Sequence, residues 1–389
     1  MIELNYDQLT IRFPAIEESL RQRIRAWVDA KVAKATPAQR GHLPATGEDL
    51  YRKFSPYLAR VEVKVSFQRT LRIPDDGKDY PLPPGLGEFP LRHVDDFAAT
   101  PAEWKKSGGV MLPMHRTEAM WLSFDSGYPM ALRVGAGGVC AVSGQTWSSG
   151  LTAKPQNYLV LPSQPWLDGF RVSENVIRQF VAVPLGKGLT VEQQITGQES
   201  WGGLQLQAFP MHEDIHWQRT VEPRLRSTWD ALVNPLPVRQ FLHEDQATYS
   251  LRQIHRKTCC EAPAMGLGAG GRMRQEITAD RFGVPAWNSM LTSRCYVHLC
   301  LAEEWRRLTG EDCPTQPPTA QDYTESGMPW FDFDNGEEPV TGSTPLSSVK
   351  SVNDLVVDKT GLDLADNESV TPTFVHLVKP KTDKTVTEF

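Results

Sequence analysis

The sequence contains one literal match to a catalytic motif, the H-E-x-x-H of residues His212-Glu213-Asp214-Ile215-His216. In that motif two imidazoles lie one helical turn apart and bind zinc, while the glutamate polarises the metal-bound water. The motif favours, as an alternative function, a zinc-dependent hydrolase of the metallopeptidase type. His212 and His216 are then the metal ligands, Glu213 is the catalytic residue, and zinc is the cofactor.

The surroundings of this motif differ from those of known zinc hydrolases. It follows Pro210 directly, at the end of a predicted strand and not inside an apolar helix. A catalytic zinc needs a third protein ligand, and the nearest candidates are Glu222, His243 and Glu244. Whether the protein is an enzyme therefore stays open at this point.

A second set of candidates combines tryptophans with charged residues at breaks between predicted strands. Tryptophan ring faces stack on sugars and other flat ligands, and carboxylates accept protons from ligand hydroxyl groups. The same tryptophans can instead be hydrophobic plugs at the ends of a β-sandwich. The candidate ligand contacts are Trp147, Trp166, Asp168, Arg178 and Trp201.

A third candidate is the glycine-rich segment Gly266-Leu267-Gly268-Ala269-Gly270-Gly271, which matches G-x-G-x-x-G in letters. No convincing strand precedes it, so the βαβ context of a dinucleotide site is missing. We expect a flexible or tightly turned loop here. Such a loop can bind an anion through its backbone N–H groups, so anion or nucleotide binding by Gly268, Arg272 and Arg274 is a second alternative.

Residues 60–210 must position most of these side chains. Val61, Val63, Val65 and Phe67 alternate with polar residues, which is typical of a half-buried strand. Short apolar runs then recur between Gly, Ser and Pro breaks, and this spacing favours an antiparallel β-sandwich or open barrel. The further predicted strands are 109–114, 119–124, 130–134, 139–142, 158–161, 176–183, 189–195 and 204–209.

Helices are expected on both sides of this β domain. Apolar residues recur at three- and four-residue steps from Ile16 to Val32, which predicts an amphipathic helix, and a shorter helix is expected over 48–58. The later helical predictions are 217–233, 247–257, 286–308 and 347–357, followed by a strand over 373–378.

The predicted fold class is therefore α+β, with an antiparallel β-sandwich-like core, an N-terminal helical insertion and a mainly helical C-terminal half. Residues 1–59 form the first strand and the insertion, and 60–210 the β domain. Residues 211–310 form a mainly helical region packed on it, and 311–389 a Pro- and acid-rich loop with a terminal helix and strand.

Composition excludes some classes of function. With 40% hydrophobic residues, 23% charged residues and a formal net charge of −6, the chain resembles an ordinary globular protein without the basic surface that nucleic acid requires. No apolar run approaches the ~18–20 residues of a membrane-spanning helix. The N-terminus lacks the features of a secretory signal, and the six cysteines contain no C-x-x-C pair, so we expect a cytoplasmic protein with reduced thiols.

Several segments resemble an uncharacterised family of bacterial and fungal proteins of about this chain's length. They include Phe67–Gly77, Pro81–Gly87, Gly108–Met114 with Glu118–Trp121, Gln164–Gly169, Ile177–Ala182 with Gln194–Gly197, and Met265–Leu267. The resemblance spans about Ser66 to Phe333, and the helices before Arg60 are an addition to it. The family has no assigned activity, so the resemblance implies no mechanism, and its members are expected to lack H-E-x-x-H.

The favoured prediction is a soluble, non-enzymatic ligand-binding or interaction protein that binds a small-molecule or protein ligand through a loop face of the β domain. The zinc hydrolase and the anion-binding protein remain the two alternatives.

Overall fold

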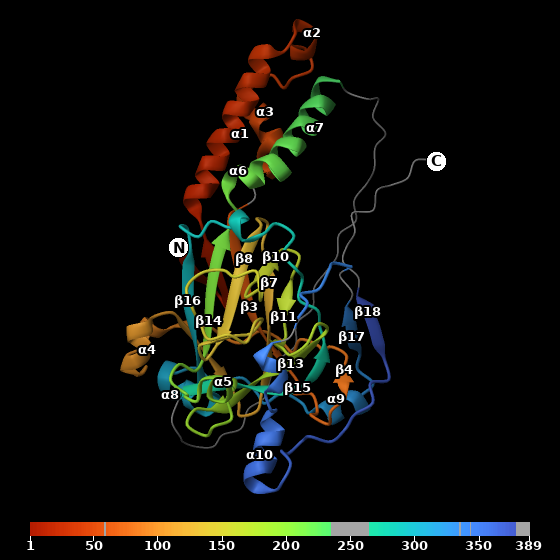
Figure 1. Cartoon of the computed structure of the whole chain (residues 1–389). Coiled ribbons are helices and arrows are strands. Elements are labelled where there is room, and N and C mark those ends of the chain that lie inside the picture. Colours follow the sequence, from red (N-terminus) through yellow and green to blue (C-terminus); the bar gives the residue numbers. More distant parts are fainter. Residues whose placement is uncertain (58–59, 235–263, 334–335, 343, 379–389) are drawn as a thin grey trace.

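The computed structural model of the chain describes residues 1–57, 60–234, 264–333, 336–342 and 344–378. Among these residues, hydrogen bonds join sixteen strands into one sheet. Most neighbouring strands in it are antiparallel, and a group of helices projects from one end of the sheet (Figure 1).

The main path through the sheet crosses ten strands. Their order is β1 (Ile2–Asn5), β2 (Gln8–Arg12), β3 (Glu62–Thr70), β7 (Ala119–Asp125), β13 (Val176–Pro184), β15 (Ala264–Arg274), β16 (Ser293–Leu301), β14 (Leu204–Pro210), β8 (Met130–Ala136) and β10 (Leu159–Leu161). Shorter strands pair with this path: β4 (Asp79–Tyr80), β5 (Arg92–His93), β6 (Val110–Met114), β9 (Val139–Cys140), β11 (Trp166–Leu167) and β12 (Gly169–Arg171). A second, parallel sheet joins β17 (Trp330–Phe333) to β18 (Val375–Val378).

The prediction of an α+β protein with a large antiparallel sheet is confirmed. Two finer predictions are not. The hydrogen bonds form one continuous sheet and do not divide it into the two sheets of a sandwich. In the described part of 211–310, β15 and β16 are central strands of the sheet, so a mainly helical region is not confirmed there.

The glycine-rich segment is strand β15 and not a loop, so that prediction is wrong. Its glycines let neighbouring elements approach the strand closely. A Cβ atom added at Gly268 would lie 2.3 Å from Cγ2 of Val352 and 2.8 Å from the carbonyl oxygen of Leu189. Glycine in a strand often marks such a close approach. The anion-binding prediction had instead assigned these glycines to a flexible or tightly turned loop.

The helix predicted over 286–308 is also partly wrong. Ser293–Leu301 is strand β16, and a helix follows only at α8 (Ala302–Thr309). Cys295, Val297, Leu299 and Leu301 are buried on one face of the strand, and His298 and Cys300 are buried on the other, as in a central strand that is covered on both faces. The strand predicted over 189–195 is helix α5 (Val191–Thr196), capped by the hydroxyl of Thr190, which accepts from the Gln193 N–H.

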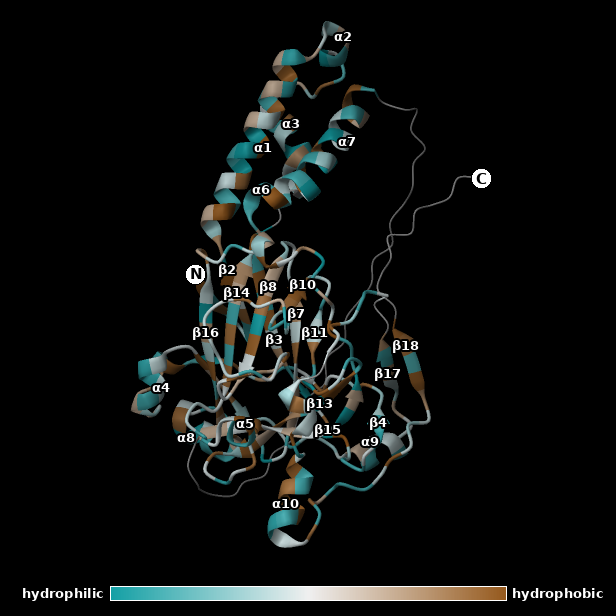
Figure 2. Ribbon diagram, viewed as in Figure 1, coloured by the Kyte–Doolittle hydropathy of each residue, from teal (hydrophilic) through white to brown (hydrophobic). Residues whose placement is uncertain are grey.

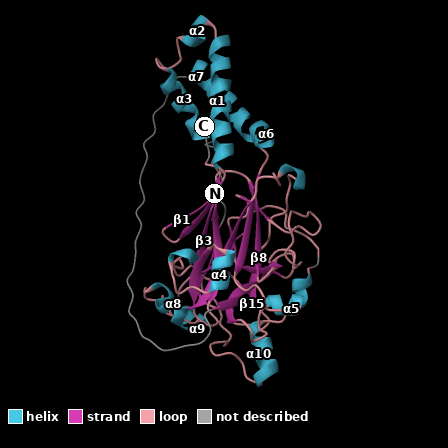
Figure 3. Ribbon diagram, turned by 90° about the vertical axis from the view of Figure 1, so that its left-hand side faces the viewer, coloured by secondary structure: helices cyan, strands magenta, loops and turns pink. Residues whose placement is uncertain are grey.

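The projecting helices combine the N-terminal segment with a later one. α1 (Pro14–Lys34) buries Leu20, Ile24 and Val28, and teal and brown residues alternate along it in Figure 2, as the predicted amphipathic helix requires. It is followed by α2 (Pro37–Arg40) and α3 (Gly47–Phe54), and α6 (Glu213–His216) and α7 (Glu222–Val233) pack beside them (Figure 3). The ring of Trp27 contacts both Phe54 and Trp229 edge-on, at centroid distances of 6.2 and 6.3 Å.

Other short helices surround the sheet. They are α4 (Ala102–Ser107), α9 (Ala320–Glu325), α10 (Val352–Thr360), the π-helical turn Trp217–Val221, and the 3-10 turns Ser55–Tyr57, Val94–Asp96, Val284–Ala286 and Pro345–Ser348. The helix predicted over 247–257 lies outside the described residues. In the described part of the chain, no helix combines the length and the apolar character that crossing a bilayer requires.

Candidate functional site

A pocket of about 360 Å³ lies where β7, β11 and β17 approach the segment Leu82–Gly85. We call it the Asp168 pocket. Its lining is largely aromatic and aliphatic, and its volume falls in the range of small-molecule sites. The lining residues are Leu82, Pro83, Pro84, Gly85, Trp121, Trp166, Asp168, Phe331, Phe333 and Val378.

One wall of the pocket follows from antiparallel pairing between β7 and β11. Trp166 pairs with Ser123, and Leu167 pairs with Leu122. Continued by one residue, this register brings Asp168 beside Trp121. Since side chains alternate along extended chain, Trp166 and Asp168 point to the same side.

The facing wall comes from β17. The N–H of Leu82 donates to the carbonyl oxygen of Phe331 at 2.7 Å, and the Phe331 N–H donates back to Leu82 at 2.9 Å. These two bonds fix β17 against the Leu82–Gly85 segment. Phe331 and Phe333 then line the pocket together, and the ring of Phe333 contacts that of Trp166 at a centroid distance of 4.3 Å.

Asp168 is the buried polar group of the pocket, with only 5% of its surface exposed. Nε2 of Gln275 donates to its Oδ2 at 2.7 Å, and the indole N–H of Trp166 also bonds to the carboxyl group. Burial raises the pKa of Asp168 to about 7, and these two hydrogen bonds counteract the shift only in part. In the described part of the chain, no Lys, Arg or His side chain forms an ion pair with Asp168.

The remaining walls offer a ligand few hydrogen bonds. Pro83 and Pro84 have no backbone N–H. The indole N–H of Trp121 is buried and has no hydrogen-bond partner among the described residues, so Trp121 presents carbon surface to the pocket. The Trp166 N–H already bonds to Asp168. The pocket can therefore hold an apolar body and make its strongest polar contact at Asp168.

Trp147 and Trp201, predicted as ligand contacts, lie away from this pocket. The guanidinium of Arg133 lies over the ring of Trp147, 4.2 Å from its centroid, and that ring packs on Gly135, so Trp147 serves the packing of the sheet. Trp201 is 58% exposed and lies beside Gly138, on a different pocket.

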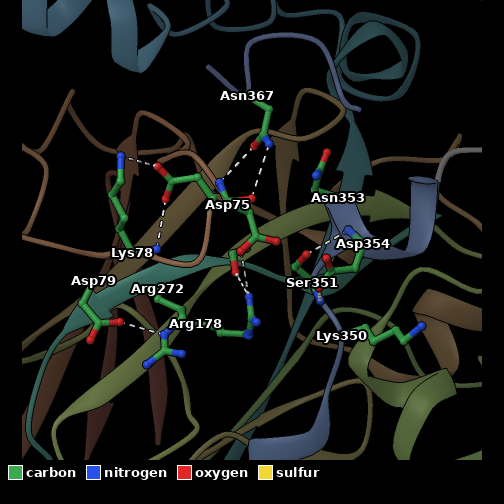
Figure 4. A network of polar contacts seen from close by, with 12 residues as sticks. Asp75, Lys78, Asp79, Arg178, Arg272, Lys350, Ser351, Asn353, Asp354 and Asn367 are labelled. Carbon is green, nitrogen blue, oxygen red and sulfur yellow. Dashed lines mark hydrogen bonds and ion pairs between the residues drawn. The ribbon is translucent and has the colours of Figure 1, made fainter. Parts of the chain in front are cut away.

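The predicted arginine contacts are each bonded to a carboxylate. Nη1 of Arg178 lies 3.1 Å from Oδ1 of Asp75, and Nε of Arg272 lies 2.7 Å from Oδ1 of Asp79 (Figure 4). Arg274 bonds to Asp332 at 2.9 Å. Gly268 is buried within β15, where its backbone pairs with Val181. The predicted cradle of N–H groups is thus a hydrogen-bonded strand.

The H-E-x-x-H residues begin the helical segment that follows β14. His212 is the residue before α6, and Arg23 forms ion pairs with Glu213 at 3.6 Å and Asp214 at 2.7 Å. His216 is 3% exposed, its ring lies 4.3 Å from that of Tyr128, and its Nδ1 is buried without a hydrogen-bond partner among the described residues. Burial lowers the pKa of His216 to about 4.

No group of three His, Cys, Asp or Glu side chains among the described residues is arranged to hold a metal ion. His243 and Glu244, two of the three suggested third ligands, lie outside those residues. Of the six cysteines, Cys140, Cys295 and Cys300 are free and buried, and Cys313 is free and half-buried.

Two residues of the pocket, Trp166 and Asp168, were predicted from the sequence, and its other aromatic residues were not. Phe331 and Phe333 carried a signal, because two aromatic residues separated by one position share a face of a strand. Trp121 and Gln275 carried none, since each reaches Asp168 from a distant part of the sequence.

The fold and the pocket define an α+β protein with one buried carboxyl group at a ligand-sized aromatic pocket. No protein-family model, no curated protein and no solved structure matches this chain.

Proposed function

We propose that the protein binds a small molecule in the Asp168 pocket and does not transform it chemically. The observation that carries this proposal is a carboxyl group with 5% exposure at the wall of an aromatic pocket of about 360 Å³. Ligand sites combine such an apolar lining with a small number of placed polar groups.

Binding without catalysis is favoured by the composition of the lining. Among the described residues that line the pocket, Asp168 is the only one with a titratable side chain. Acid–base catalysis and nucleophilic catalysis each rely on a reactive group that a second group activates or complements. The described walls place no such partner beside Asp168, whereas they offer four aromatic side chains for contact.

Indole is a suitable first probe, because it is flat, uncharged and small enough for the pocket. Its binding is measured by isothermal titration calorimetry against the natural protein and the variant Trp121→Ala. Loss of one aromatic contact should weaken binding by about three- to tenfold. Trp201→Ala is the matched control, since it removes a tryptophan outside the pocket. Equal affinities for both variants, or no saturable binding, would contradict the proposal.

The zinc-hydrolase alternative remains a separate prediction with its own test. His212 and His216 bracket one helical turn, but the described residues supply no third ligand group beside them. Elemental analysis of protein purified without a His-tag or chelator, repeated on His212→Ala, decides it. Close to one zinc per chain, lost in the variant, would support the hydrolase over the binding protein.

A further inference from the structure

We propose that the natural ligand of the Asp168 pocket carries one positively charged nitrogen on an apolar body, as a quaternary or protonated amine does. This inference rests on the proposed function and specifies the class of ligand. It is carried by three features of the pocket as the described residues form it: aromatic walls, one carboxyl group, and no Lys, Arg or His side chain paired with that group.

The aromatic walls suit a cation. Trp121, Trp166, Phe331 and Phe333 all line the pocket, and the rings of Trp166 and Phe333 are in contact. Each ring face carries partial negative charge, so an ammonium group within about 6 Å of the ring centroids is attracted electrostatically. Sites that enclose quaternary ammonium groups are built from aromatic rings in this way.

The carboxyl group of Asp168 suits the same ligand. A buried carboxylate is costly unless a positive charge or several hydrogen bonds compensate it. Trp166 and Gln275 each supply a hydrogen bond, but neither supplies a charge. Neighbouring ion pairs do not supply one either, because Arg274 is paired with Asp332 and Arg178 with Asp75. A cationic ligand would provide the missing charge.

A sugar, the ligand class that tryptophans beside a carboxylate first suggest, fits less well. Each hydroxyl group that enters the pocket needs a hydrogen-bond partner in place of water. Pro83 and Pro84 offer no N–H, the Trp121 N–H is buried, and the backbone of Leu82 is already bonded to Phe331. The several hydroxyl groups of a sugar would have to rely mainly on Asp168, which is better matched to a single cation.

The test titrates benzyltrimethylammonium and indole into the natural protein, Asp168→Asn and Asp332→Asn. The quaternary ammonium should bind the natural protein, and Asp168→Asn should weaken it by about tenfold or more. Asp168→Asn should keep the cooperative urea-unfolding transition of the natural protein, which shows that this variant is folded. Asp332→Asn removes a carboxylate on β17 that is bonded to Arg274, and it should leave both affinities unchanged.

A second measurement needs no variant. Choline is compared with the neutral alcohol in which carbon replaces its nitrogen, and the charged molecule should bind the natural protein more tightly. If indole binds but the charge gives no advantage and Asp168→Asn has no effect, the inference is wrong and the proposed function stands. If neither indole nor the ammonium ions bind, both are wrong.

Discussion

Gln275 and Asp168 form a reciprocal pair of hydrogen bonds. Nε2 of Gln275 donates to Oδ2 of Asp168 at 2.7 Å, and Oε1 of Gln275 accepts from the backbone N–H of Asp168 at 3.1 Å. One amide side chain thus fixes both the backbone and the carboxyl group of Asp168. This contact joins the chain just beyond β15 to the turn between β11 and β12, so it couples the pocket to the centre of the sheet.

We predict that Gln275→Leu destabilises the protein by about 1–3 kcal/mol. The substitution leaves the buried N–H of Asp168 without an acceptor, and an unsatisfied buried donor costs about that much. Urea unfolding measures the effect. Gln22→Leu, on the exposed surface of α1, is the control and should change stability by less than about 0.5 kcal/mol. Equal changes in the unfolding free energy at both sites would mean that the reciprocal pair of hydrogen bonds does not stabilise the protein.

The raised pKa of Asp168 predicts how stability depends on pH. Burial raises that pKa from 3.8 in the unfolded chain to about 7 in the folded protein. Between these pH values the folded state retains a proton that the unfolded chain has released. The stability associated with the neutral carboxyl is therefore fully present below pH 3.8 and is lost as pH rises to 7, by about 1.4 kcal/mol per pH unit.

Asp168→Asn tests this dependence, because an amide does not titrate. The unfolding free energy of the variant minus that of the natural protein should rise with pH between 5 and 7 and then level off. The difference removes the contributions of all other groups, including the neighbouring Arg274, Glu276, Asp332 and His376. A difference that stays constant with pH would show that Asp168 is not held in its neutral form.

The lowered pKa of His216 predicts the opposite pH dependence, a loss of folding stability as the pH falls. Burial lowers its pKa from 6.5 to about 4, so the unfolded chain binds a proton in that interval and the folded protein does not. Stability is therefore present above pH 6.5 and is lost as pH falls toward 4, by about 2 kcal/mol at pH 5. His216→Phe keeps a ring against Tyr128 and should abolish this loss. Parallel stability curves for the two proteins between pH 5 and 7.5 would contradict the assignment.

The glycine at position 268 is predicted to be required by packing and not by ligand binding. Gly268→Ala places a methyl group 2.3 Å from Cγ2 of Val352 and should destabilise the protein by about 1–3 kcal/mol. Adding Val352→Ala should recover part of that loss. In Gly47→Ala, the nearest atom outside the local backbone is 3.9 Å away, so this control should be tolerated. Destabilisation by the double variant equal to the sum of the single effects would argue against this contact.

Local patterns in the sequence predicted local structure well. The apolar period of α1 and the alternation of Val63, Val65 and Phe67 in β3 each reflect a face that packs against its neighbours. Patterns failed where a distant partner decides the conformation. Gly268 of β15 leaves room for Leu189 and Val352, which are far away in sequence and pack where a side chain would otherwise lie.

In the site, too, the residues that are close in sequence could be predicted, and those brought together by strand pairing could not. Trp166 and Asp168 are two residues apart, so their shared face could be read from one strand. Trp121 and Phe333 join them only through the pairing of β7 with β11 and of β17 with the segment at Leu82. Neither pairing can be predicted from the local sequence. Trp201 was predicted as a ligand contact on the same grounds as Trp166, but it lines another pocket.

The most direct test of the Asp168 pocket is to locate a bound probe by NMR. The methyl groups of Leu82 and Val378 line the pocket, whereas those of Val63 and Leu206 are buried in the main core. With methyl-labelled protein saturated with indole, the account predicts intermolecular NOEs from indole protons to the methyl groups of Leu82 and Val378 and none to those of Val63 or Leu206. Saturable binding with NOEs only to methyl groups elsewhere, or no binding at millimolar indole, would contradict the account.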